Sequence, residues 1–180
     1  EKIAHFSKSE GGFLTADDLA DFQVREEPPV STNYRGYEVF ACGPWCQGPT
    51  VPQTLKLLEG FDLARLHPSH PDYLHCLVEA IKLTFADRHK YYGDPDFVNV
   101  PITHLLSEEY ARTRRPLLNP ARAWATMPPH GNPFEMAQET THLPDDGEGR
   151  AGSGGQQGDT SYVCSVDSEG NAFSATPSDF

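Results

Sequence analysis

The sequence predicts an α+β fold, because it combines one long helix pattern with one clear strand–turn–strand pattern. Residues 71–92 predict the longest helix, since apolar side chains recur there with the 3.6-residue period of a helix. The predicted buried face of this helix consists of Leu74, Leu77, Val78, Ile81 and Phe85. Residues 160–166 and 172–176 alternate as strands do, with turn-forming residues between them, so they predict a β-hairpin that begins at Thr160.

Two sequence patterns predict the local structure of the first thirty residues. Thr15 and Asp18 have the spacing of a capping box, which predicts a short helix that carries Leu19 and Phe22. The pair Pro28–Pro29 excludes a helix at that point and predicts extended backbone.

A strand and a short helix are predicted between these prolines and the long helix. Residues 36–41 predict the strand, and residues 42–52 form a loop rich in proline and glycine. Residues 54–59 predict the helix, and Gly60 is placed to terminate it.

Charged residues gather near the end of the long helix, over residues 87–90, and Gly93 follows them. We interpret this cluster as a solvated helix end whose cations interact with the C-terminal dipole. Ser107 is expected to cap another short helix over 107–114, whereas residues 119–143 lack a regular pattern.

The composition narrows the classes of partner. The net charge is −12, and such an acidic chain is expected to repel nucleic acid. No apolar run approaches the roughly 20 residues that a membrane-spanning helix needs. Because Glu1 is not a start methionine and Phe180 falls inside an apparent strand, we expect a piece of a longer protein, and the compartment stays open.

Cysteines and histidines offer two weaker signals. Cys42 and Cys46 are separated by three residues, which fits a zinc or redox pair, although free thiols are the commoner interpretation. Three histidines lie close together before and within the long helix, at positions 67, 70 and 75, beside Cys76. Prolines break the regular spacing that metal ligands need, so we predict no metal and no cofactor.

The junction between Asp159 and Thr160 is the strongest candidate for chemistry. A glycine-rich stretch, 145–158, ends there, and the predicted hairpin begins. If the chain cleaved itself at this peptide bond, Thr160 would gain a free α-amino group with a pKa of about 7.7–8.0, close to that of an ideal general base. The hydroxyl would then have its own activating base. From the pattern alone, a threonine that merely starts a strand after a loop is the commoner interpretation.

Sequence motifs along nearly the whole chain resemble those of the gamma-glutamyltranspeptidases, a family of N-terminal nucleophile hydrolases. The similar segments are Gly11–Leu19, Tyr34–Val39, Leu57–Leu63, Tyr92–Val98, Leu106–Ala111, Asp159–Tyr162, Val166–Asp167 and Gly170–Ala172. The most specific of them contains the Asp159–Thr160 junction.

The resemblance implies a fragment of a four-layer αββα sandwich and a precursor that cleaves itself between Asp159 and Thr160. Residues 1–159 would be the C-terminal part of the large subunit, with a flexible tether over 145–159. Residues 160–180 would begin the small subunit and carry the nucleophile. Thr160 would attack a small-molecule amide, form an acyl-enzyme and pass the acyl group to water or an amine, while Ser178 would lie near the nucleophile's amino group.

Two positions depart from the family's pattern. Tyr162 stands where the family commonly has histidine, and Phe180 stands where transpeptidases usually have an asparagine that helps to hold the glutamyl amino group. We therefore expect a gamma-glutamyltranspeptidase-like amidohydrolase or acylase, with Phe180 as a candidate substrate-binding residue. The alternative is an uncleaved, inactive member that acts as a binding or scaffold protein. The acyl substrate, the acceptor and the oligomeric state stay open.

Overall fold

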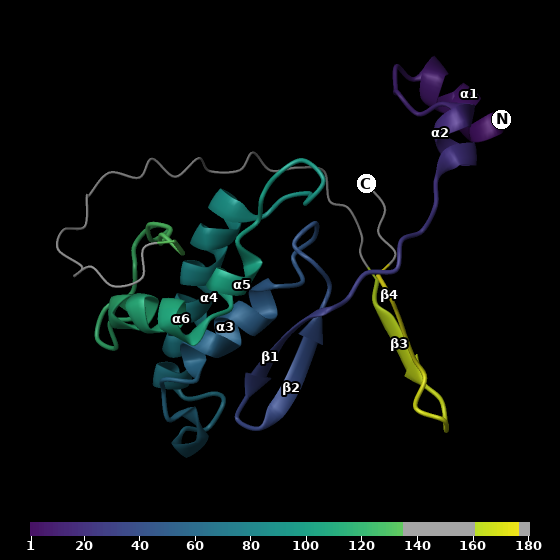
Figure 1. The fold of residues 1–180 in the computed structure, drawn as a ribbon. Coiled ribbons are helices and arrows are strands. Elements are labelled where there is room, and N and C mark those ends of the chain that lie inside the picture. Colours follow the sequence, from purple (N-terminus) through teal and green to yellow (C-terminus); the bar gives the residue numbers. More distant parts are fainter. Residues whose placement is uncertain (135–160, 177–180) are drawn as a thin grey trace. The chain divides into compact units, whose positions relative to one another are not determined.

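The chain divides into two compact units, residues 1–144 and 145–180. A computed structural model describes residues 1–134 of the first unit and 161–176 of the second. Helices and strands occur together, which agrees with the predicted α+β class (Figure 1). The described elements of the first unit are α1 (Lys2–Ser9), α2 (Ala16–Asp21), β1 (Val30–Tyr34), β2 (Tyr37–Ala41), α3 (Thr50–Leu58), the 3₁₀ helix η1 (Leu63–Arg65), α4 (Pro71–Tyr91), α5 (Ile102–Leu105), α6 (Glu108–Arg114) and the 3₁₀ helix η2 (Arg115–Leu117). Those of the second unit are β3 (Val163–Val166) and β4 (Ala172–Ala175).

The predicted helix caps are confirmed. The backbone N–H of Asp18 donates to the Thr15 hydroxyl at 3.1 Å, and the backbone N–H of Thr15 donates to the Asp18 carboxylate at 2.8 Å. This reciprocal pair satisfies two N–H groups that would otherwise lack partners at the start of α2. Ser107 caps α6 in the same way, by accepting from the backbone N–H of Tyr110.

The strand predicted after residue 36 is β2, and it pairs with a strand that the sequence pattern did not predict. β1 and β2 are antiparallel, and the last pair, Tyr34 with Tyr37, leaves Arg35 and Gly36 as a two-residue turn. Both turn residues have positive φ, 52° and 91°, as a type I′ hairpin turn requires. The Gly36 N–H also donates to the Asn33 side chain at 3.1 Å, which helps to hold the turn.

Helix α3 begins four residues earlier than predicted, at Thr50, so the loop before it is shorter. Pro52 led us to predict a loop, but it lies in the first turn of α3. Proline is tolerated there, because the backbone N–H that it lacks would have had no partner within the helix. The predicted end of the helix beside Gly60 is confirmed. Gly60 also leaves room for the Arg115 side chain, because a Cβ at residue 60 would lie 2.6 Å from Cδ of Arg115.

Helix α4 has almost the predicted bounds, but three of the five residues on its predicted buried face are exposed, while Leu77 packs against the core. Leu74, Val78 and Ile81 are 47%, 48% and 38% exposed. The opposite face is buried and includes polar side chains, because partners on neighbouring elements satisfy them. The buried residues of α4 are Cys76, Glu79, Ala80, Leu83, Thr84, Ala86 and Asp87.

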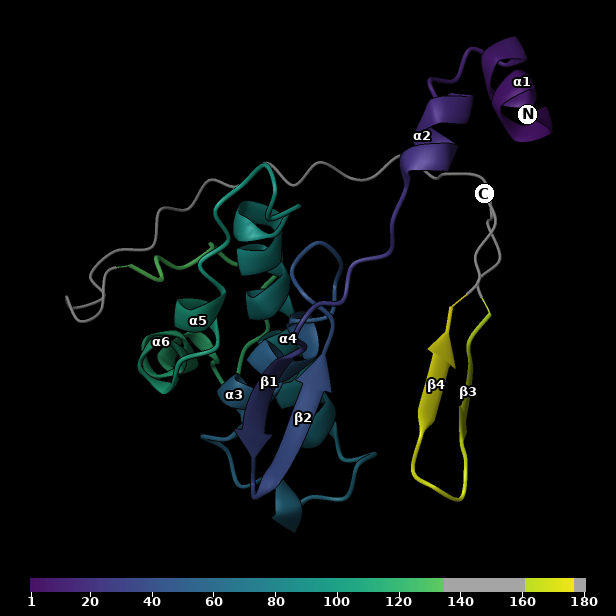
Figure 2. The ribbon, with the colours of Figure 1, turned by 45° about the vertical axis from the view of Figure 1, so that its right-hand side comes forward.

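The core of the first unit lies among α3, α4, α6 and the segment that follows α6. Helix α3 packs against α4, α6 and the β1–β2 hairpin, and the two views show the hairpin beside α3 (Figures 1 and 2). The buried cluster consists of Leu57, Leu58, Leu63, Cys76, Ala80, Leu83, Ala111 and Leu118. Among the described residues, no helix has both the length and the apolar character needed to cross a bilayer.

Candidate active site

The second unit contains the predicted active-site segment, and its described part is a two-stranded hairpin. Strands β3 and β4 are antiparallel, with Val163 opposite Ala175 and Val166 opposite Ala172. The hairpin is confirmed, although its first strand begins at Val163 rather than at Thr160. Four predicted site residues lie outside the described residues: Asp159, Thr160, Ser178 and Phe180.

Tyr162 lies two residues after the predicted nucleophile, within the described part of the chain. Its hydroxyl accepts a hydrogen bond of 3.3 Å from the Ser174 hydroxyl on β4. Side chains alternate between the faces of a strand, so Tyr162 and Cys164 share one face with Ser174, which pairs with Cys164. This face of the hairpin therefore carries hydroxyl groups at the start of β3, which the predicted nucleophile precedes in the sequence.

Asp167 holds the turn between β3 and β4. Its Oδ1 accepts from the backbone N–H groups of Glu169 and Asn171, both at 2.9 Å, and its Oδ2 accepts from the Asn171 side chain at 2.8 Å. These hydrogen bonds, first among them the one from the Asn171 side chain, lower the pKa of Asp167. Gly170 adopts φ of +86°, which the turn requires and which other residues rarely adopt. The turn thus sets the register of the two strands.

The histidines singled out in the sequence have local structural roles. The His70 ring accepts from the Asp72 backbone N–H at the start of α4, and the His67 ring lies 2.7 Å from the Ser69 hydroxyl. His75 and Cys76 line an open pocket of about 240 Å³, but the His75 ring is bonded to the Asn119 carbonyl at 2.8 Å. Among the described residues, no three His, Cys, Asp or Glu side chains are grouped so as to hold a metal ion.

A buried ion pair was missed by the sequence analysis, which interpreted Asp87 as part of a solvated helix end. Asp87 is completely buried, and Nη2 of Arg114 lies 3.3 Å from its Oδ1. The same carboxylate accepts from the Gln53 side chain at 2.7 Å and from the Gly131 backbone N–H at 2.8 Å. Burial raises the pKa of Asp87, while Arg114 and the donated hydrogen bonds oppose that shift. The sequence pattern did not reveal this, because Asp87 lies on the same face of α4 as Leu83, and the predicted buried face was a different one.

This ion pair fixes the segment after α6 and the end of α4. Arg114 also donates to the Pro129 carbonyl at 2.8 Å, and the Tyr92 hydroxyl donates to the Gln53 side chain at 2.9 Å. Burial raises the pKa of Tyr92, and the nearby Asp87 charge adds to the shift. Tyr92 is therefore a protonated donor within a structural network.

A second buried carboxylate, that of Glu79, holds an earlier part of the same segment, at Trp124. Glu79 accepts from Lys82 at 2.7 Å and from the Trp124 backbone N–H at 3.0 Å, while Lys82 also donates to the Trp124 carbonyl. The stretch after α6, which the sequence showed only as irregular, is thus attached to α4 through buried charges.

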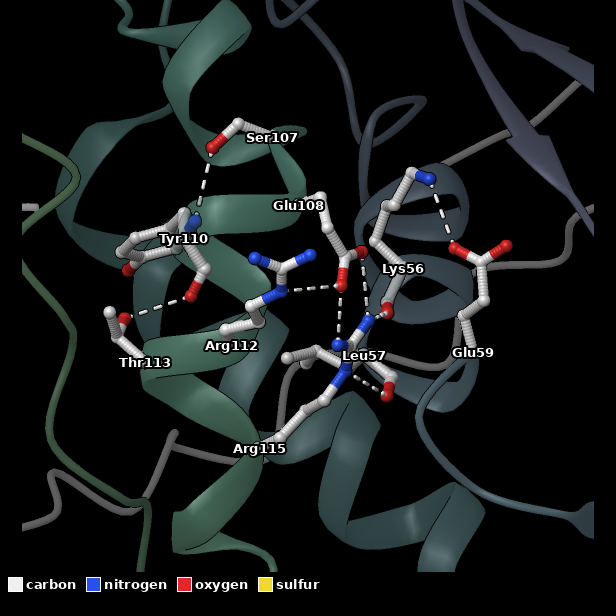
Figure 3. Close-up of polar contacts among 9 residues, drawn as sticks. All are labelled: Lys56, Leu57, Glu59, Ser107, Glu108, Tyr110, Arg112, Thr113 and Arg115. Atoms are coloured by element: carbon white, nitrogen blue, oxygen red, sulfur yellow. Dashed lines mark hydrogen bonds and ion pairs between the residues drawn. The ribbon is translucent and has the colours of Figure 1, made fainter.

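Arg115 joins α6 to the C-terminal end of α3 (Figure 3). Its guanidinium donates to the carbonyls of Lys56 and Leu57 at 2.7 and 3.2 Å, and to both carboxylate oxygens of Glu108 at 2.6 and 3.0 Å. The last carbonyls of a helix lack intrahelical partners, so Arg115 serves as a side-chain cap. The hydrogen bonds from Arg115 lower the pKa of Glu108, and the Arg115 charge adds to this shift.

The family model described as gamma-glutamyltranspeptidase matches residues 1–179, so the chain belongs to this family. The resemblance inferred from the sequence motifs is therefore confirmed.

Curated relatives are named as proenzymes. An "Acylase ACY 1 proenzyme" of Pseudomonas sp. (strain SE83) is 34% identical over 176 residues, which cover 97% of this chain and 27% of the relative. A "Glutathione hydrolase proenzyme" of Escherichia coli (strain K12) is 35% identical over 155 residues, which cover 84% of this chain and 27% of the relative. The chain therefore spans about a quarter of the length of these relatives.

Solved structures of the same family have a similar fold. The gamma-glutamyltranspeptidase of Helicobacter pylori matches with a TM-score of 0.66 and 27% identity, over 78% of this chain and 42% of that one. The cephalosporin acylase of Bacillus halodurans matches with a TM-score of 0.58 and 38% identity, over 63% of this chain and 21% of that one. The neighbours thus include both a transpeptidase and an acylase.

Proposed function

We propose that the chain is part of a self-processing threonine amidohydrolase of the gamma-glutamyltranspeptidase family, in which cleavage after Asp159 frees Thr160 as the nucleophile. The observation that carries this proposal is the register of the β3–β4 hairpin. The outermost described pair of this ladder is Val163 with Ala175. If the same register continued for three more residues on each strand, Thr160 would lie opposite Ser178.

That pairing would bring two hydroxyl side chains together. Directly opposed residues of an antiparallel pair have Cβ atoms about 4.5–5.5 Å apart and project from the same face. This would be the face on which Ser174 already bonds Tyr162. Ser178 would then lie close enough to bond the amino group of Thr160 and orient it.

The proposed chemistry needs no group beyond Thr160 to remove the proton of its hydroxyl. The free α-amino group accepts the hydroxyl proton as Oγ1 attacks the carbonyl carbon of an amide substrate. The amino group then returns this proton to the departing amine, which leaves an acyl-enzyme ester. Water or a second amine attacks the ester, and Thr160 is released for another cycle.

The complete fold in this proposal is the four-layer αββα sandwich, with residues 1–159 in the large subunit and 160–180 at the start of the small one. The described hairpin supports this arrangement indirectly. Only Ala175 of its described residues is even partly buried within this chain. A two-stranded hairpin is marginal by itself, so β3 and β4 need further strands and a covering layer from the rest of the protein.

We propose a gamma-glutamyl or related amide as the substrate. The relatives named glutathione hydrolase and acylase support an amide whose acyl part varies within the family. Phe180 would favour an acyl group with less charge than a glutamyl group, because an aromatic ring binds an ammonium ion only weakly through its face.

The test uses the full-length precursor and three variants. Wild-type protein should appear as two bands on a denaturing gel, Thr160→Ala should remain as one band, and Thr160→Ser should be cut because it keeps the hydroxyl. The processed wild type should hydrolyse a γ-glutamyl anilide or an acyl anilide. Ser178→Ala should slow turnover more than it weakens substrate binding. A single wild-type band with no turnover would refute the proposal and favour an uncleaved binding protein.

A further inference from the structure

The loop between β2 and α3 folds back on itself and holds two cysteines. The backbone N–H of Cys46 donates to the Gly43 carbonyl at 3.4 Å, and its thiol donates to the same oxygen, also at 3.4 Å. Gly48 lies against Cys42 so closely that a Cβ at residue 48 would be 2.4 Å from the Cys42 carbonyl oxygen. Residues 42–48 therefore form a closed loop, in which the Cys42 and Cys46 thiols lie close enough to interact through a hydrogen bond.

The two thiols differ in access. Cys42 is exposed and Cys46 is half-buried, and both are free. Burial raises the pKa of Cys46, and the neighbouring Cys42 thiol adds to this shift. The Gly48 N–H donates to the Cys46 sulfur at 3.2 Å and opposes the shift, because it stabilises a thiolate. An external reagent therefore reaches Cys42 first, and Cys46 is placed to react second.

A carboxylate lies beside the loop. Trp45, between the two cysteines, donates its indole N–H to Glu27 at 2.7 Å. The same Glu27 oxygen would be 3.7 Å from a Cβ at Gly43. A negative charge at this position disfavours anionic reagents near the thiols and leaves neutral ones unaffected.

We propose that Cys42 and Cys46 form a reversible disulfide within this loop by exchange with small, neutral disulfides. The Cys42 thiolate attacks one sulfur of the reagent, which forms a mixed disulfide and releases one thiol. The Cys46 thiolate then attacks the Cys42 sulfur, which closes the loop and releases the second thiol. The two cysteines lose two electrons and two protons, and the reagent disulfide gains them. Dithiothreitol reverses both steps.

Peptide mapping of the full-length protein tests the crosslink directly. Trypsin cleaves after Arg35 and Lys56, so both cysteines fall in one peptide, 36–56. After treatment with hydroxyethyl disulfide, this peptide should be lighter by two hydrogens and should resist alkylation. Either Cys42→Ser or Cys46→Ser should abolish the crosslink, whereas Cys76→Ser and Cys164→Ser should retain it.

Kinetics of the variants test the order of the two steps. Cys46→Ser should accumulate the mixed disulfide on Cys42, and Cys42→Ser should react about tenfold more slowly, since exposure controls thiol reactivity. Hydroxyethyl disulfide should react faster than oxidised glutathione, which is anionic, and Glu27→Gln should narrow that difference. A mixed disulfide that persists on Cys42 beside an alkylated Cys46 in the wild-type protein would overturn the proposal. So would a complete failure of both cysteines to react.

Discussion

The helices of residues 1–134 and the hairpin of residues 161–176 are stabilised in different ways. The helical region has a buried apolar cluster and two buried carboxylates, Glu79 and Asp87, each held by several donors. The hairpin has almost no buried surface in this chain and depends on cross-strand pairing and on the Asp167 turn. The helical region thus contains its own stabilising contacts, whereas a two-stranded hairpin with so little buried surface is marginally stable by itself.

The largest effect should come from breaking the buried ion pair. Arg114→Met leaves the Asp87 carboxylate buried beside an apolar side chain, and such a change costs about 3–5 kcal/mol of unfolding free energy. The loss should appear in urea unfolding of the full-length protein and as faster hydrogen exchange in α4 and α6.

Arg112 offers a matched control on the same helix. Its guanidinium pairs with Glu108 at 3.3 Å, but its side chain is 70% exposed. Arg112→Met should therefore cost no more than about 0.5 kcal/mol, as exposed pairs of this spacing do. Equal losses in the two variants would show that burial does not distinguish these ion pairs.

The next largest effect should come from Arg115, which joins α6 to α3. Arg115→Ala removes the donors to two helix-terminal carbonyls and to Glu108, and should cost about 1.5–3 kcal/mol. Gly60→Ala should destabilise the protein for a different reason, because its new Cβ would meet the Arg115 side chain.

A double-mutant cycle separates these two causes. In the Arg115→Ala background, Gly60→Ala should lose most of its cost, since the side chain that it would meet is gone. Strictly additive losses would mean that Gly60 is needed for its backbone conformation rather than for space.

The bounds of these elements were more predictable than their packing. Pro71 and Gly93 marked the ends of α4 correctly, because capping and chain breaking are local effects. Three of the five residues predicted to be buried are exposed, because the sequence does not show which neighbours satisfy a polar residue such as Glu79 on the face that is buried instead. β1 was missed because Ser31, Thr32 and Asn33 give no apolar alternation, and its pairing with β2 depends on the turn at Arg35.

The candidate site shows the same limit. The turn over 167–171 and its hairpin were predicted, because Asp, Gly and Asn encode the turn locally. The bond from Ser174 to Tyr162 was not predicted, because it depends on the register across the turn. The roles of Thr160 and Ser178 stay a proposal that rests on that register.

A smaller effect should follow from replacing Gly170, whose backbone conformation residues with a side chain rarely adopt. A Cβ at Gly170 meets nothing within 4 Å, so Gly170→Ala would be strained only through its φ of +86°. The expected cost is about 1–2 kcal/mol, and Gly170→Asn should cost less, because asparagine tolerates left-handed backbone. Hydrogen exchange should quicken in β3 and β4 but not in α4. A matching change in α4 would show that the two regions unfold together.

The smallest effect concerns the decrease in the free energy of unfolding as the pH falls into the acid range. The hydrogen bonds from Arg115, together with its charge, lower the pKa of Glu108 in the folded state, so this carboxylate stabilises the protein above the ordinary pKa of glutamate. That contribution is lost as the pH falls through the lowered folded-state pKa. Glu108→Gln should therefore be less stable than wild type at neutral pH, and the two stability curves should converge in acid. The effect is small because the Glu108 side chain is 34% exposed to solvent.

Asp167→Asn provides the comparison in the hairpin, because hydrogen bonds also lower the pKa of Asp167. Its effect should appear in the exchange of β3 and β4 alone, and a loss of global stability as large as that of Glu108→Gln would contradict the separation of the two regions.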